Sequence, residues 1–348
     1  MKKLAIIVFA LLLSQAVIAQ NFIGPHGFLT FEAEISDRDS IGRRGTFDLH
    51  HFNVLGNYLL NAQARVFGEV EWEHGADFES FERRRSSSGF VRLERAWFEY
   101  AFSGKIKLRV GKFLTPYGIY NEIHDAAPAY DTSILPNSLY GRHRILNGDD
   151  QRLYAKFAIG LQVLGKLEFG QSAIEYRALI SNGRGESPFE QDDNSDKGIG
   201  LRLIAHLPST GLRLGYSLYT DKNGLASNTR QTSHAWDAHL EWNRWRLTGE
   251  FAHSRLDPTS GDLYKQIANG GYAELSYILF KNQTLLVRYD LLDPDSRQVN
   301  DLQRDLTVGM NIRIIKQALV KAEVHFWETR GLLPENFVLA IASLAVVF

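Results

Sequence analysis

Apolar and polar residues alternate along almost the whole chain after residue 20. In one clear stretch, Leu212, Leu214 and Leu218 alternate with Arg213 and Ser217. A period of two is the repeat of a β-strand, because successive side chains of a strand point to opposite faces. The pattern therefore predicts an all-β protein in which most strands have one apolar face and one polar face.

The alternation divides into about sixteen segments of roughly 9 to 13 residues, the length that a tilted strand needs to cross a bilayer. An even number of antiparallel strands suits a closed single-chain barrel. The predicted strands are 27–36, 46–56, 62–73, 90–101, 104–113, 152–165, 170–182, 198–207, 211–221, 232–242, 244–254, 270–280, 283–292, 304–314, 317–328 and 336–348.

The connections between these segments are alternately tight and long. Tight turns at one end and long loops at the other are typical of transmembrane β-barrels. A soluble β-sandwich also alternates, but it has edge strands to protect and no reason for such a bias. We therefore expect a transmembrane antiparallel β-barrel of about 16 strands. The tight connections include 208–210, 243–244 and 281–282, and the long ones include 74–89, 183–197, 256–269 and 293–303.

The longest connection, about 115–151, is expected to fold into the barrel as an internal constriction loop. Pro116, Pro128 and Pro136 argue against further barrel strands within it. Its tyrosines could pack against the barrel wall. The alternative is a surface loop that lies outside the lumen.

The two ends of the sequence predict an exported protein. Lys2 and Lys3 precede an apolar stretch that is too short to span a membrane, and Ala19 closes a possible cleavage site. Residues 1–19 are therefore predicted to be a cleaved signal peptide and 20–348 the barrel domain. The terminal Phe348 resembles the signal that the outer-membrane assembly machinery recognises. Together these features predict that the protein is located in the cell outer membrane.

Composition removes several other classes of protein. The formal net charge is −1 and no long basic run occurs, so a nucleic-acid partner is not expected. The chain has no cysteine, which excludes disulfides, thiolate zinc sites and cysteine nucleophiles. No cofactor is predicted.

Catalytic and metal-binding patterns are weak. There is no Gly-x-Ser-x-Gly elbow, and the histidines are scattered. His50 and His51 are adjacent, but neighbouring side chains of a strand point to opposite faces, so no metal site is predicted. We expect a protein that is not an enzyme. A barrel enzyme acting on lipid and a structural or adhesive barrel remain as alternatives.

Strand parity places many ionisable residues on the inner face of the barrel. A dry core could not hold so many ions, since each costs several kcal/mol to desolvate unless it is paired, so we expect water in the lumen. The inward residues include Lys107, Arg109, Arg177, Arg202, Arg213, Arg288 and Lys321, together with Glu69, Glu71, Glu250 and Glu323.

The internal loop carries charges that could act on a passing solute. Glu122, Asp125 and Asp131 are expected to face the basic wall, with Arg142 and Arg144 nearer the mouth. Opposed charges across a constriction orient solutes and tune ion preference. The alternative is that the wall arginines pair with neighbouring glutamates across strands and contribute only to stability.

One motif resembles a known family. The run from Arg109 to Gly118, with Gly111, Phe113 and Pro116, is similar to the strand that leads into the internal loop of the phosphate-selective porin O and P family. The resemblance implies a sixteen-stranded porin, commonly trimeric, whose internal loop narrows the pore.

The family's arginine and lysine ladders have no residue-by-residue match here, so phosphate ligands are not carried over. The expected function is passive diffusion of small hydrophilic solutes or ions, with anions as a candidate. The expected partners are outer-membrane lipid and lipopolysaccharide, the assembly machinery and two further copies of the chain.

Overall fold

The computed structural model describes most of the barrel and parts of the loops. The described residues are 22–38, 45–73, 90–123, 127–141, 143–144, 150–184, 192, 194–222, 229–258, 265–298, 301–330 and 335–348. The predicted signal peptide, 1–19, lies outside them.

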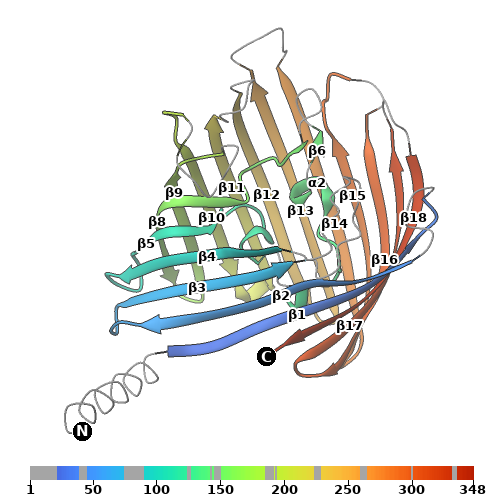
Figure 1. The fold of residues 1–348 in the computed structure, drawn as a ribbon, viewed down its shortest axis with the longest axis horizontal. Coiled ribbons are helices and arrows are strands. Elements are labelled where there is room, and N and C mark those ends of the chain that lie inside the picture. The colour runs from blue at the N-terminus through green and yellow to red at the C-terminus, as the bar shows by residue number, and fades with distance from the viewer. Residues whose placement is uncertain are drawn as a thin grey trace, which may run out of the picture.

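Sixteen antiparallel strands form one closed barrel (Figure 1), which confirms the predicted fold class and rules out the sandwich. Each strand overlaps one of the sixteen predicted segments. The strands are β1 Phe22–Ser36, β2 Thr46–Leu59, β3 Ala64–Glu73, β4 Phe90–Ala101, β5 Lys107–Leu114, β8 Phe157–Phe169, β9 Ser172–Ser181, β10 Gly198–Leu207, β11 Leu212–Lys222, β12 Arg230–Trp242, β13 Trp245–Asp257, β14 Gln266–Phe280, β15 Gln283–Asp293, β16 Gln303–Ile315, β17 Ala318–Thr329 and β18 Glu335–Val347.

The first and last strands close the barrel. β1 pairs with β18 from Phe28 opposite Val347 to Ser36 opposite Leu339. The backbone N–H of Gly27 donates to the carbonyl of Phe348 over 2.8 Å, and the N–H of Phe348 donates back to Gly27 over 3.0 Å. The terminal residue is thus part of the seam.

All the tight turns lie at the end of the barrel where β1 begins and β18 ends, and all the long connections lie at the other end. We call these the short-turn end and the long-loop end. In the described part of the chain, the helical segments are too short to cross a bilayer.

The two faces of the strands differ as parity predicts. On β11, Leu214 is 43% exposed on the outer surface, whereas Ser217, an inward residue of the same strand, is fully buried. The outward residues at the short-turn end include Trp242 and Trp245, which are 66% and 41% exposed. An apolar outer face with aromatic residues near its edge is typical of a barrel in contact with lipid.

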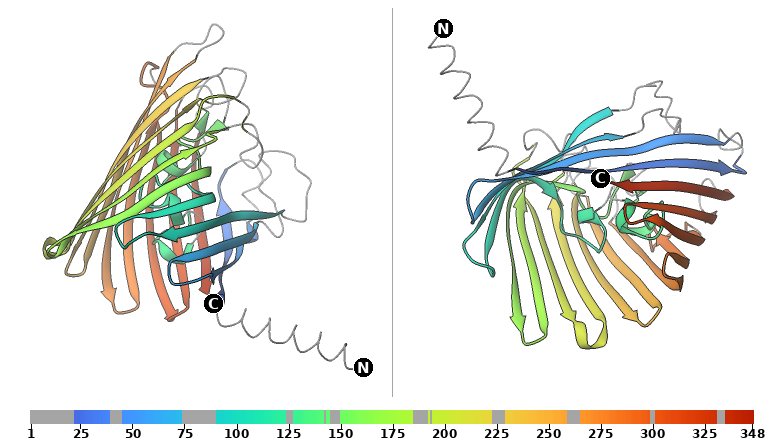
Figure 2. Two further views of the ribbon diagram at one scale, coloured as in Figure 1. Left: turned by 90° about the vertical axis from the view of Figure 1, so that its left-hand side faces the viewer. Right: turned by 90° about the horizontal axis from the view of Figure 1, so that it is seen from below.

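The connection between β5 and β8 folds into the barrel. It contains η2 (Asn121–Ile123), η3 (Ala127–Ala129), α2 (Asn137–Tyr140) and a small pair of strands, β6 (His143–Arg144) with β7 (Asp150–Gln151). Figure 2 shows this green segment within the ring of strands when the molecule is seen from below. The predicted internal loop is therefore confirmed.

Candidate functional site

The sequence of β5 turns the chain inward. Gly111 has φ 132°, a backbone conformation that side chains disfavour, and a Cβ there would lie 2.3 Å from the carbonyl oxygen of Ala96. Beyond it the alternation stops, and Lys112 and Phe113 are both buried. The N–H of Thr115 then donates to the carbonyl of Lys156 over 3.0 Å, which closes the neck of the internal loop.

Aromatic residues hold the internal loop against the wall. The rings of Tyr117 and Tyr154 stack with centroids 4.2 Å apart, and Tyr120 packs against Tyr140 and Tyr272. Alanines on the facing strands leave room for these rings. The resulting core includes Ala235, Ala252 and Ala268, all fully buried.

Glu250 on β13 is the main polar anchor of the internal loop. Its carboxylate accepts hydrogen bonds from the hydroxyls of Tyr140 and Tyr272, each over 2.7 Å, and from the N–H of Ile119 over 2.9 Å. Burial, followed by the nearby Glu250 charge, raises the pKa of Tyr140 well above its ordinary value. The Tyr140 hydroxyl therefore stays protonated and can donate.

A second anchor lies on β15 and β17. The ammonium group of Lys321 donates to the carbonyls of Ala127 and Thr132 over 2.7 and 2.6 Å. Glu323 accepts from the N–H of Ser133 over 2.9 Å, and Arg288 donates to the Thr132 hydroxyl over 2.8 Å.

These anchors correct one expectation about the inner wall. Arg288 and Lys321 are 1% and 0% exposed, and Glu250 and Glu323 are each 4% exposed, because the internal loop covers them. Partners in the loop and on the wall compensate their burial. From the sequence we expected inward charge to indicate water. On this side of the barrel that expectation is wrong, because the internal loop covers the charged groups.

Space remains between the internal loop and strands β9 to β14. This lumen cavity has a volume of about 520 Å³. Charged side chains of both signs line it, and those on the wall include Arg177, Arg213, Arg246 and Glu274. His206 and His239 lie at its short-turn end.

Two acidic residues of the internal loop face arginines of this wall. Glu122 lies 3.2 Å from the guanidinium of Arg177, and Asp131 forms an ion pair with Arg246. The structure thus places these two residues opposite arginines. Asp125 and Arg142 lie outside the described residues, as does the side chain of Arg144.

The predicted wall arginines differ in what surrounds them. Arg202 is 2% exposed and donates to Asp237 over 2.7 Å. Arg109 donates to Glu99 over 2.7 Å. These two pair with acidic neighbours on the wall, as the alternative interpretation expected. Arg202 and Arg213 both line the lumen cavity, and Lys107 is half-buried on β5.

The predicted glutamates of β3 are also paired. Glu69 accepts from Arg95 and from the Asn53 amide, the latter over 3.0 Å. Glu71 accepts from Arg92 over 2.7 Å. Both carboxylates are buried in the wall, so they are not isolated charges facing the lumen.

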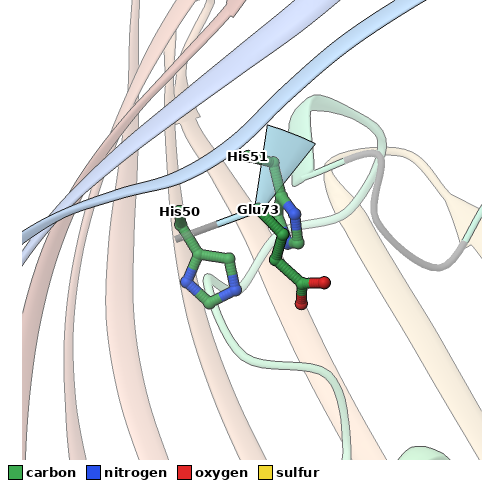
Figure 3. A group of neighbouring side chains, drawn as sticks. All are labelled: His50, His51 and Glu73. Atoms are coloured by element: carbon green, nitrogen blue, oxygen red, sulfur yellow. The ribbon is translucent and has the colours of Figure 1, made fainter. Parts of the chain in front are cut away.

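One group of residues was missed because a β-bulge interrupts β2. Thr30 pairs with His51 and the next residue of β1, Phe31, pairs with Leu49, so His50 is the extra residue. Both imidazoles therefore point into the barrel, with ring centroids 4.1 Å apart (Figure 3). The expectation that they point to opposite faces is wrong.

The sequence contained a signal for this bulge. The outward apolar residues of the strand are Phe47 and Leu49 before the histidines, and Phe52 and Val54 after them. The apolar phase changes from odd to even numbers at this point, which is what one inserted residue produces.

Comparisons with known proteins agree with this fold. No family model matches the chain. A curated protein of Aquifex aeolicus (strain VF5), described as uncharacterized, is 30% identical over 137 residues, which are 39% of this chain. The matched part is 27% of that protein, so the match spans about a quarter of the curated relative.

Solved structures match over nearly the whole length. An anion-selective porin from Comamonas acidovorans has a TM-score of 0.69 at 13% identity, over 93% of this chain and 99% of that chain. The trimer form of OmpT, an outer membrane protein of Vibrio cholerae, has a TM-score of 0.62 at 12% identity, over 94% and 98%. Salmonella typhi OmpF, in a complex with daunomycin, has 0.59 at 14%, over 93% and 97%.

The closed barrel and its internal loop define a transmembrane β-barrel of the porin fold. At identities of 11 to 14%, the likeness establishes the fold alone.

Proposed function

We propose that the protein is an outer-membrane porin through which small hydrophilic solutes or ions diffuse passively. The lumen cavity is the observation that carries this proposal. It lies inside a closed barrel, and charged side chains from the internal loop and the wall surround it. A charged lining of this kind suits hydrated solutes. Opposed charges orient a passing ion without binding it tightly, so the ion can leave the cavity.

We further propose a weak preference for anions. Arg213 lines the lumen cavity on the wall side. The guanidinium of Arg177 contacts the carboxylates of both Glu122 and Glu175. Guanidinium groups recognise carboxylates and phosphates. Phosphate, suggested by the resemblance at Gly111 to Gly118, is one candidate solute.

Reconstitution in planar bilayers tests both statements. If the porin proposal is right, the protein should form stable, ohmic channels. If anions are weakly preferred, the zero-current potential in a salt gradient should have the sign of an anion-permeable channel. Replacing Arg177 and Arg213 together by Gln should move that potential toward cation preference. Arg244→Gln, in the exposed turn before β13, is the matched control and should leave it unchanged.

The same recordings distinguish the alternatives. A structural or adhesive barrel should give no current, and a barrel enzyme should turn over lipid. Correctly folded protein that never conducts would contradict the porin proposal. A conducting channel whose potential ignores the Arg177 and Arg213 substitutions would contradict only the proposed selectivity.

The proposal includes export through a signal peptide and assembly in the outer membrane as a homotrimer. The solved neighbours support it, since one is the trimer form of a barrel with the same fold. Lipid and lipopolysaccharide would surround the outer face. Native gel mobility and mass photometry of the purified barrel test the trimer.

A further inference from the structure

We propose that His50, His51 and Glu73 form a binding site for a divalent transition-metal ion, of the Zn²⁺ type, on the inner wall of β2 and β3. One potential ligand atom of each residue lies within 4.8 Å of the others. Figure 3 shows the two imidazoles and the carboxylate side by side, from two neighbouring strands. The site lies toward the long-loop end and is separate from the lumen cavity.

The ligand set determines the kind of ion. Imidazole suits Zn²⁺, Cu²⁺ and Ni²⁺, whereas Ca²⁺ and Mg²⁺ prefer oxygen ligands. Zinc bonds of about 2.0 to 2.1 Å place tetrahedral ligand atoms about 3.3 Å apart, so small side-chain rotations would bring the three together. Three protein ligands leave one position for water or a solute.

The surroundings orient both histidines. The Nδ1 atom of His50 lies 3.1 Å from Glu32, and the Nδ1 atom of His51 lies 3.0 Å from Glu71. Histidine ligands of zinc sites contact carboxylates through one ring nitrogen in this way and bind the metal through the other. His51 is 6% exposed, so its ring is held by packing as well.

The local charge favours a cation. Glu32, Glu71, Glu73 and Asp48, which lies 3.5 Å from the Nδ1 atom of His50, contribute four carboxylates. One guanidinium, that of Arg92, lies 2.7 Å from Glu71 and 2.6 Å from Glu73. A bound divalent ion would reduce this excess of negative charge and share Glu73 with Arg92.

Isothermal titration of the folded full-length barrel in detergent, free of any histidine tag, tests the site with Zn²⁺. We expect saturable binding that weakens by at least about tenfold in the double variant H50Q/H51Q and in Glu73→Gln. The double variant H206Q/H239Q removes two other inward histidines, at the short-turn end, and should bind Zn²⁺ as the original chain does. Paramagnetic resonance of bound Cu²⁺ should show coupling to imidazole nitrogen that disappears in H50Q/H51Q.

Three outcomes would overturn the site: no Zn²⁺ binding by the folded barrel, undiminished binding by H50Q/H51Q, or equal binding of Ca²⁺, which would make it a general acidic surface. The electrophoretic mobility of unheated samples shows whether each variant is folded. Titration in detergent does not depend on conduction, so failure here and failure of the porin proposal are separate results.

Discussion

At the scale of single residues, what an inward side chain does depends on how deeply it is buried and on the partners around it. Arg202 and Arg213 both point inward from neighbouring strands. Both line the lumen cavity, but Arg202 is 2% exposed and pairs with Asp237, whereas Arg213 is half-buried. The same residue type therefore serves wall stability in one place and is proposed to contact solutes in the other.

Gly27 is a residue whose size the closure of the barrel restricts. A Cβ at this position would lie 2.3 Å from the carbonyl oxygen of Asn53 and 2.6 Å from the ring of Phe348. We expect Gly27→Ala to destabilise the barrel by about 1 to 3 kcal/mol, the usual cost of overpacking. Denaturant unfolding followed by tryptophan fluorescence measures this cost.

Gly68→Ala is the control, because nothing lies within 4 Å of a Cβ there. Its free energy of unfolding should match that of the original chain within about 0.5 kcal/mol. Equal stability of the two alanine variants would show that the seam tolerates the added methyl group.

At the scale of elements, the internal loop and the wall of β11 to β18 form one packed unit. Tyrosines of the loop fit over wall alanines, and the carboxylates of Glu250 and Glu323 accept hydrogen bonds from the loop. The position of the loop is therefore set by side chains on strands that are distant in the sequence.

Replacing Glu250 by Ala should loosen the internal loop. The change leaves the Tyr140 and Tyr272 hydroxyls and the Ile119 N–H without their acceptor, at about 1 to 3 kcal/mol for each buried donor. In planar bilayers we expect noisier channels with a higher mean conductance. Faster cleavage of the loop by added protease should accompany this change.

Glu241→Ala is the control for the loop. Glu241 lies on the preceding strand, β12, at the short-turn end, where its carboxylate is exposed and contacts His239. Quiet, unchanged channels in the Glu250→Ala variant would mean that the aromatic packing alone fixes the loop.

At the scale of the whole molecule, a closed barrel leaves no free strand edge, and the last residue completes the ring. The backbone of Phe348 pairs with Gly27, while the residue is 51% exposed and its ring stacks against Phe52 with centroids 5.8 Å apart. The backbone of Phe348 closes the barrel, whereas its ring is the proposed recognition feature for the assembly machinery. A substitution can therefore test the second role without removing the first.

Phe348→Ala keeps both backbone hydrogen bonds and removes only the ring. If the ring is the recognition feature, the variant should refold in detergent as the original chain does but accumulate less in the outer membrane. Phe280→Ala, another exposed aromatic at the short-turn end, should accumulate normally. Immunoblots of outer-membrane fractions compare the three proteins, and equal amounts would remove Phe348 from the assembly signal.

The sequence by itself determined the fold of this protein. Alternation with period two depends only on each residue's neighbours in the chain, and it specified sixteen strands and, apart from the bulge in β2, the inward faces discussed above. The prolines between Pro116 and Pro136 likewise marked the internal loop. These are local properties, so no knowledge of distant contacts was needed.

Only the tertiary structure decided which inward charges the internal loop covers and which line the lumen cavity. That choice depends on contacts between Glu250, Lys321 and a loop more than a hundred residues away. The bulge that places His50 and His51 on one face belongs partly to each category. The change of apolar phase that marks it was visible in the sequence. Its consequence, a shared face with Glu73, required the pairing of β2 with both neighbouring strands.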